Sequence, residues 1–95
     1  MKYDEGKPDY TLIPPQILDA IWEVRKYGTQ KYGSVNNWKT VSVERYWQAV
    51  LRHVRAAWDD PTRKDPESGL PHLWHIACNI AFLLELENDL SDPAR

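Results

Sequence analysis

The sequence predicts an all-α protein of three main helices joined by functional loops. Apolar residues recur at steps of three and four in three separate stretches, and Pro, Gly, Ser and Asn gather between them. No stretch alternates apolar and polar residues as a half-buried strand would. With 95 residues, 42% of them hydrophobic, residues 1–95 are expected to form one helical domain.

The first helix is expected to begin at Pro14 and Pro15, because proline suits the first helical turn. Gly28 or Gly33 would end it. Its apolar positions are Ile17, Leu18, Ile21, Trp22 and Val24. Their spacing predicts one buried stripe, in which Trp22 is interpreted as a core residue rather than a ligand contact.

The second helix is expected after Ser42, a favourable N-cap residue, over the stretch VERYWQAVLRHVRAAW. Glu44 complements the positive end of the helix dipole. The predicted apolar stripe contains Tyr46 or Trp47, then Val50, Leu51, Val54 and Ala57. We interpret Trp47, like the tryptophan of the first helix, as a core residue.

The third helix is expected to start near Pro71 and to run through HLWHIACNIAFLLELE. Its broad apolar surface comprises Ile76, Ile80, Phe82, Leu83, Leu84 and Leu86. Two other helices would cover such a surface poorly, so we expect a homo-oligomeric helical bundle. The alternative is that the first and second helices suffice.

The composition gives the chain no general attraction to anionic partners. Twelve Lys and Arg residues stand against fourteen Asp and Glu residues, for a formal net charge of -2. We therefore expect neither a nucleic acid polymer nor a membrane as a partner, and no apolar run approaches the roughly 18 residues of a membrane span. The single cysteine, Cys78, fits a reducing compartment as a buried, inert thiol. These features predict a cytoplasmic protein.

The third helix carries a polar face inside its apolar sequence. His72, His75 and Asn79 are spaced by three and then four residues, which places them on one side of the helix. His53 stands on the second helix, and an antiparallel arrangement of the two helices would bring it toward this face.

Two carboxylates, Asp65 and Glu67, lie shortly before the third helix. Together with the histidines they form an N/O ligand set for a divalent cation, which would generate a hydroxide or hold phosphates. Alternatively, the helix N-terminus, the histidines and Arg52 would receive an anion such as a nucleotide phosphate without catalysis. A purely structural alternative is that the carboxylates cap the helix and the histidines are satisfied core residues.

The stretch RKYGTQKYGSVNNW offers a second candidate surface. It concentrates cations, aromatic rings and amides, namely Arg25, Lys26, Lys31, Tyr27, Tyr32, Trp38, Asn36 and Asn37. The cations would hold phosphates, the rings would stack on a base, and the amides would bond to its edge. The alternative is a solvated helix end whose tyrosines pack inward.

Four motifs cover nearly the whole chain in this order: YDEGKPDYTLIPP, YGTQKYGSVNNW, RYWQAVLRH and DPESGLPHLWHIACNIAFLLELE. In combination they resemble the dATP/dGTP diphosphohydrolase N-terminal domain family, found largely in bacteriophages and related to the all-α, MazG-like NTP pyrophosphohydrolases. The resemblance implies a helical oligomer that handles a purine nucleoside triphosphate in the infected bacterial host. An active member would use Mg2+ or Mn2+ to release pyrophosphate and leave the monophosphate.

Carried onto matching positions, the resemblance implies one shared nucleotide site. The catalytic residues would be His53, His72 and His75, and the metal ligands would be Asp65 and Glu67. The nucleotide-binding residues would be Lys31, Tyr32, Asn37, Trp38, Arg52 and Asn79. In this assignment Lys31 and Arg52 hold phosphates, while Trp38 or Tyr32 stacks on the base.

The acidic residues depart from the MazG-like pattern, in which paired ExxE and ExxD motifs on facing helices hold the metals. This sequence has no clear ExxE, and its nearest acidic cluster is Glu85, Glu87 and Asp89. A second hypothesis is therefore a non-catalytic phage sponge that sequesters a nucleotide-derived immune signal, either a cyclic oligonucleotide or an ADP-ribose derivative. Such a sponge would bind its ligand in pockets between subunits and would need no metal.

Overall fold

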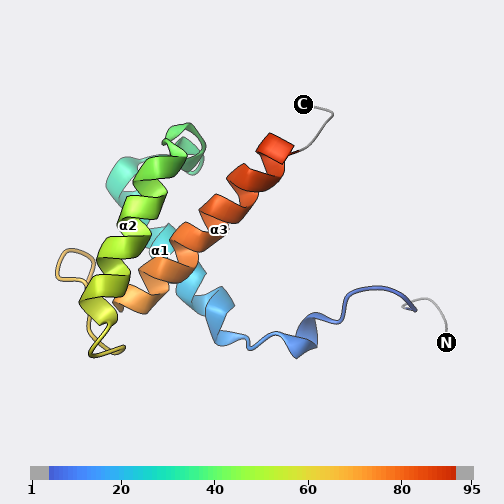
Figure 1. Ribbon diagram of the computed structural model, residues 1–95, viewed down its shortest axis with the longest axis horizontal. Coiled ribbons are helices and arrows are strands. Elements are labelled where there is room, and N and C mark those ends of the chain that lie inside the picture. Colours follow the sequence, from blue (N-terminus) through green and yellow to red (C-terminus); the bar gives the residue numbers. More distant parts are fainter. Residues whose placement is uncertain (1–4, 92–95) are drawn as a thin grey trace.

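The computed structural model describes residues 5–91, which form three long helices (Figure 1). These are α1 (Gln16–Tyr32), α2 (Val43–Ala57) and α3 (His72–Ser91), accompanied by the short 3-10 helices η1 (Tyr10–Leu12) and η2 (Asn37–Thr40). Within this range the regular structure is helical, apart from one isolated antiparallel bridge between Lys64 and Pro71. The all-α prediction is confirmed. Residues 1–4 and 92–95 of the expected domain lie outside the described part.

The end of α1 and the start of α2 fall at residues that favour helix ends. Of the two glycines proposed to end α1, the structure selects Gly33, which has a φ of 67° and donates its N–H to the carbonyl of Thr29. Glycine tolerates this left-handed conformation without a steric penalty. Residues 29–32, which would lie outside the helix if it ended at Gly28, are therefore helical. Ser42 is the N-cap residue of α2 as predicted, although its side chain makes no capping hydrogen bond.

α3 is the central helix, because it packs along α2 and also contacts α1 and η2. The core cluster consists of Tyr46, Val50 and Leu83, with further partly buried apolar side chains around them. The Tyr46 hydroxyl donates to the carbonyl of Trp38 at 2.6 Å, which ties η2 to α2. Burial raises the pKa of Tyr46 to about 12, so this hydroxyl keeps its proton.

The interpretation of Trp22 and Trp47 as core residues is wrong. Their side chains are 58% and 52% exposed. Only part of each predicted stripe faces inward: the buried residues are Ala20 and Val24 on α1 and Tyr46, Val50 and Ala57 on α2. Ile17, Leu18 and Leu51, also predicted for the stripes, are exposed like the two tryptophans. Cys78, by contrast, is buried as predicted, with 1% exposure, and burial raises the pKa of its thiol to about 11.

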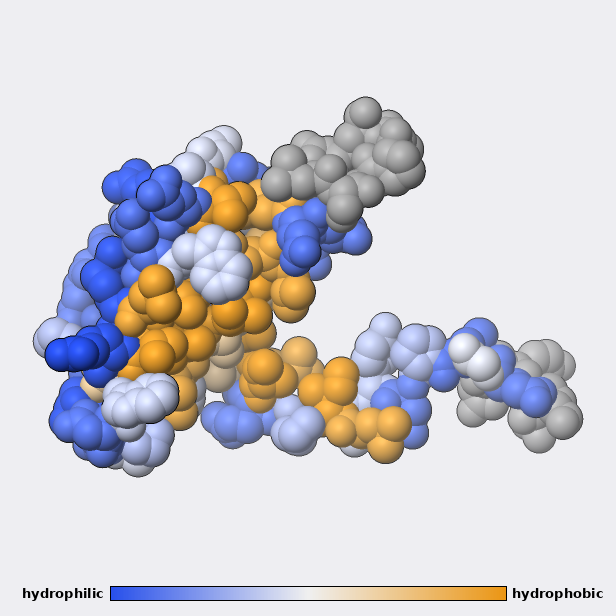
Figure 2. All heavy atoms as spheres, viewed as in Figure 1, coloured by the Kyte–Doolittle hydropathy of each residue, from blue (hydrophilic) through white to orange (hydrophobic). Residues whose placement is uncertain are grey.

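The segment before α1 projects away from the three helices (Figure 1), and residues 5–19 are all exposed. The Cα radius of gyration is 15.6 Å, whereas a compact domain of this length has about 12 Å. On the face shown in Figure 2, apolar side chains gather over α2 and α3 and along the projecting segment. Much apolar surface is thus left uncovered by a single chain.

None of the helices in residues 5–91 combines the length and the apolar character that a bilayer crossing requires.

Candidate functional site

A cavity of about 570 Å³ lies between the three helices and their loops. This volume is within the range of small-molecule sites. Of the residues that the resemblance assigns to the nucleotide site, all but His72 line it: Lys31, Tyr32, Asn37, Trp38, Arg52, His53, Asp65, Glu67, His75 and Asn79. Two members of the second candidate surface, Lys26 and Asn36, are not among the lining residues. The fold therefore joins the two candidate surfaces into one site, although they are far apart in the sequence.

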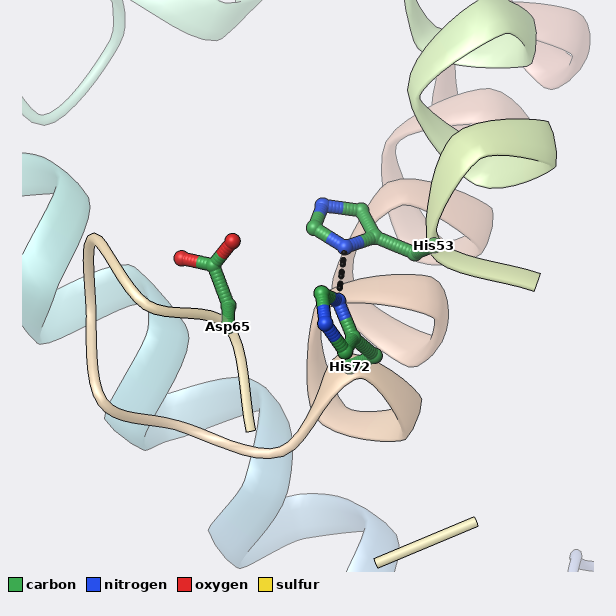
Figure 3. Close-up of side chains that lie close together, drawn as sticks. All are labelled: His53, Asp65 and His72. Carbon is green, nitrogen blue, oxygen red and sulfur yellow. Dashed lines mark hydrogen bonds between the residues drawn. The ribbon is translucent and has the colours of Figure 1, made fainter. Parts of the chain in front are cut away.

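Three histidines meet where α2 passes the start of α3. The two helices run antiparallel (Figure 1), as the interpretation of His53 required. The Nδ1 atoms of His53 and His72 lie 2.8 Å apart (Figure 3). The ring of His75 stacks on that of His53, with centroids 4.7 Å apart and an interplanar angle of 9°. His72 and His75 are buried. The cluster therefore extends from the cavity, which His53 and His75 line, to the buried ring of His72.

Asp65 reaches this cluster through a tight reversal of the chain before α3. The N–H of Asp65 donates to the carbonyl of Leu70 at 2.8 Å, and the N–H of His72 donates to the carbonyl of Arg63 at 3.0 Å. Gly69, with a φ of 75°, supplies the left-handed residue that the reversal needs. Asp65 therefore does not act as the N-cap of α3; the loop brings its side chain back beside the histidines (Figure 3).

Ser68 holds two of the polar groups in place. Its N–H donates to Oδ2 of Asp65 at 2.9 Å, and its Oγ lies 2.6 Å from Nε2 of His75. The same oxygen of Asp65 is 3.9 Å from Nε2 of His75. Burial acts to raise the pKa of Asp65, but the hydrogen bonds from Ser68 and the nearby histidines outweigh it, and the net pKa is lowered. Asp65 is an ionised carboxylate at neutral pH.

His53 and His75 are neutral at the same pH. Burial, followed by the neighbouring rings of His75 and His72, lowers the pKa of His53 to about 4. Burial also lowers the pKa of His75, against the opposing effect of Asp65. Neutral imidazoles have the lone pairs that metal binding and proton transfer require.

This arrangement predicts that acid destabilises the protein through His53. Its pKa is about 4 in the folded protein and about 6.5 when unfolded, so the unfolded state binds more protons between these values. The stabilising contribution is complete above pH 6.5 and is lost as the pH falls toward 4. Urea unfolding followed by tryptophan fluorescence from pH 7.5 to 4 should show this decline, and His53→Gln should flatten it. Equal slopes in both proteins would contradict the assignment.

The residues that can hold a metal ion differ in part from those expected. The ligand atoms of His53, Asp65 and His72 all lie within 4.8 Å of one another. Two imidazoles and one carboxylate are a suitable donor set for a divalent cation. Glu67 lies outside this group, because its carboxylate forms an ion pair with Lys31. The Lys31 hydrogen bond lowers the pKa of Glu67, and the same contact raises the pKa of Lys31.

Four cationic side chains line the cavity: Arg25, Lys31, Arg45 and Arg52. Arg45 was missed by the sequence reasoning, although its spacing of seven from Arg52 places both on one face of α2. Ser68 was missed as well, and only its position in the turn after Asp65 could have indicated its role. With four cations against two carboxylates, the cavity favours an anionic ligand.

The aromatic residues divide into a packed wall and an exposed rim. Trp38 stacks on Phe82, with centroids 4.9 Å apart and an interplanar angle of 14°. Tyr32 is 61% exposed, and Nζ of Lys31 lies 5.1 Å from the centroid of its ring. Tyr32 thus offers the more accessible ring for stacking on a base. The amide nitrogen of Asn79 donates to the carbonyl of His75 at 2.9 Å.

The fold and the cavity define a class of small helical protein in which a histidine and carboxylate cluster adjoins cationic and aromatic walls. The chain belongs to the family described as dATP/dGTP diphosphohydrolase, N-terminal, whose model matches residues 1–92. It is also similar to a protein of Salmonella phage PMBT28 named dATP/dGTP diphosphohydrolase, with 36% identity over 89 residues. The match covers 94% of this chain but 30% of that relative. No solved structure matches the chain.

The described members of the acidic cluster at the end of α3 do not line the cavity. Glu85 and Glu87 are exposed, and neither is among the residues that line it. The side chain of Asp89, the third member of that cluster, lies outside the described part of the structure. Within the described part, the carboxylates of the cavity are Asp65 and Glu67 alone.

Proposed function

We propose that the cavity binds a purine nucleoside triphosphate and that the protein is a metal-dependent pyrophosphohydrolase acting on dATP-like or dGTP-like substrates in the cytoplasm of an infected bacterium. The observation that carries this proposal is the convergence of cations, rings, histidines and carboxylates on one cavity. The name of the phage relative supports the substrate class.

The walls of the cavity suggest how the nucleotide lies. The base stacks at the aromatic end, against Tyr32 or Trp38, and the phosphates face the cations, above all Lys31 and Arg52. His53, His72 and Asp65 hold the divalent ion. When bound, that ion would polarise a phosphoryl oxygen and lower the pKa of a water molecule.

His75 lines the cavity and is placed to accept a proton from the attacking water. Ser68, whose Oγ lies 2.6 Å from Nε2 of His75, holds the imidazole ring in its orientation. The water oxygen bonds to the α-phosphorus, the bond from this phosphorus to the bridging oxygen breaks, and pyrophosphate leaves. Asp65, 3.9 Å away, stabilises the imidazolium that forms.

Product analysis tests the proposal directly. Purified protein is incubated with a panel of purine nucleotides in Mg2+, Mn2+ or EDTA, and the solution is analysed by HPLC. The expected result is metal-dependent formation of a monophosphate and pyrophosphate from dATP or dGTP. Nucleotides that remain unchanged in every metal would contradict hydrolysis.

One observation favours a second candidate function, a sponge that retains a nucleotide-derived immune signal without cleaving it. Glu67 is neutralised by Lys31, so of the two carboxylates among the described residues of the cavity only Asp65 is left without a lysine or arginine partner. A sponge would return its ligand intact after heat denaturation, and EDTA would change nothing. Arg52→Ala and Trp38→Ala would weaken retention. Loss of binding in EDTA would contradict a metal-free sponge.

We also propose that the chain self-associates. Large apolar side chains are exposed on the projecting segment and on all three helices, among them Leu12, Leu18, Trp22, Trp47, Leu51, Trp58 and Leu84. Monomeric proteins rarely expose this much contiguous apolar surface, and a two-fold pairing would cover it.

Sedimentation velocity tests the pairing. Wild-type protein should sediment as a dimer or larger assembly, and Trp47→Lys should shift it toward the monomer because a charge then replaces exposed apolar surface. Gln48→Lys is the control, since it adds the same charge at an exposed neighbouring position without removing apolar surface. A wild-type monomer at all concentrations would contradict self-association.

A further inference from the structure

The donor atoms beside the cavity have a composition that selects among metal ions. We propose that His53, His72 and Asp65 form a three-ligand site for a first-row transition-metal ion, such as Mn2+ or Co2+, and that this site discriminates against Mg2+. The inference deepens the proposed function, on which it rests only for the use of the ion in hydrolysis.

The positions of the three ligand atoms suit one shared ion. Two ligands at about 2.1 Å from a metal lie about 3 Å apart when adjacent and about 4.2 Å apart when opposite. The Nδ1 atoms of His53 and His72 are 2.8 Å apart, close to the adjacent value. All three ligand atoms fall within 4.8 Å of one another. Because a third ligand must lie about 3 Å from at least one of these nitrogens, a movement of the Asp65 carboxylate by at most about 2 Å would complete the site.

The two histidines come from different helices, which makes their juxtaposition a property of the fold. His53 is on α2 and His72 is the first residue of α3 (Figure 3). In the contact between their Nδ1 atoms one nitrogen must carry a proton, because two bare lone pairs repel each other. An ion that replaces this proton would use both lone pairs, and one proton would be released.

The choice of ion follows from the donors. Imidazole nitrogen suits Co2+, Ni2+ and Zn2+, and Mn2+ accepts it more readily than Mg2+, which prefers a shell of oxygen ligands and gives up its waters reluctantly. A Mg2+ site here would need a second carboxylate. Glu67 is committed to Lys31, and Glu85 and Glu87 do not line the cavity. Asp65 remains as the one anionic ligand.

Asp65 is also held in position before any ion arrives. Its carboxylate accepts the Ser68 N–H at 2.9 Å, and the reversal of the chain is closed by the hydrogen bond from Gly69 N–H to the carbonyl of Asp65 at 2.8 Å. Fixed ligand orientation raises metal affinity, because less conformational entropy is lost on binding.

Metal binding is measured on the full chain without nucleotide. Protein stripped with EDTA and dialysed is titrated with MnCl2, CoCl2 or MgCl2 in a calorimeter, and the Co2+ complex is examined by visible absorption. The expected result is one ion per chain, with Mn2+ and Co2+ bound at least about 100-fold more tightly than Mg2+, and Co2+ absorption bands typical of nitrogen and oxygen ligands. Asp65→Asn and His53→Gln should each weaken Co2+ binding at least about 10-fold.

Asp60→Asn is the matched control. Asp60 lies in the same loop and accepts the N–H of Thr62 at 3.0 Å, much as Asp65 accepts that of Ser68, but it is not in the ligand group. The Asp60→Asn variant should bind Co2+ with the affinity of the wild-type protein. The proposal is overturned if the protein binds Mg2+ as tightly as Co2+, or if it binds no Co2+. It is also overturned if Glu67→Gln lowers the Co2+ affinity as much as Asp65→Asn does. Co2+ bound without any nucleotide hydrolysis would sustain this inference and contradict the proposed function.

Discussion

Replacement of Asp65 by asparagine is expected to lower kcat for pyrophosphate release by about 100- to 1,000-fold while the helical fold is retained. Asparagine keeps the shape of the side chain and can still accept the Ser68 N–H, but it removes the negative charge beside the histidine cluster. That charge serves the proposed mechanism twice, as a ligand of the ion and as the partner of His75. The measurement is monophosphate formation from dATP or dGTP at saturating metal.

The control for this prediction is Asp60→Asn, which should keep wild-type turnover because Asp60 is outside the cavity. Far-UV circular dichroism of both variants establishes that the helices persist. Full activity in Asp65→Asn would remove the cluster from the mechanism. His72→Ala should also abolish turnover, since His72 holds the ion through Nδ1 in the same proposal.

Replacement of Leu83 by alanine is expected to lower the free energy of unfolding by about 2–4 kcal/mol. Leu83 is 7% exposed and belongs to the core cluster with Tyr46 and Val50. Its truncation leaves a cavity in a core that is small for the length of the chain. Because domains of this size are stable by only about 5–15 kcal/mol, much of the total stability would be lost. Urea denaturation followed by tryptophan fluorescence measures the change.

Leu84 offers a matched control, being the same residue type one position later and 60% exposed. Leu84→Ala in the monomer should cost less than about 0.5 kcal/mol, since little of this side chain is buried within the chain. At high protein concentration, Leu84→Ala could instead lower the free energy of unfolding as much as Leu83→Ala does. If that difference disappears on dilution, Leu84 lies in a subunit interface.

The helices were predictable because local signals define them. Three- and four-residue apolar spacing, Ser42, Gly33 and Pro71 mark the elements through backbone preferences that act within a few residues. The face that each helix buries was less predictable. Trp22 and Trp47 match the three- and four-residue spacing as well as their neighbours do. Which of these side chains is buried depends on how the helix is turned toward its partner helix.

For the candidate site, the sequence predicted which residues take part better than it predicted which of them contact one another. The spacing of His72, His75 and Asn79 indicated one polar face, because side chains three and four apart share a side of a helix. The pairing of Glu67 with Lys31, in place of a role beside Asp65, joins residues 36 positions apart. Such a pairing has no local signal, since it arises only when the loop before α3 folds against the end of α1.

The sequence by itself determined the helical class, the starts of α2 and α3 and most of the residue types of the cavity, because propensity, capping and periodicity act over short stretches. It left the end of α1 open between Gly28 and Gly33. Tertiary structure alone decided that His53, His72 and Asp65 converge, that Arg45 lines the same cavity as Arg52, and that Glu67 pairs with Lys31. The reason is physical: antiparallel packing of α2 on α3 and the tight reversal at Gly69 set distances between residues that have no local interaction along the chain.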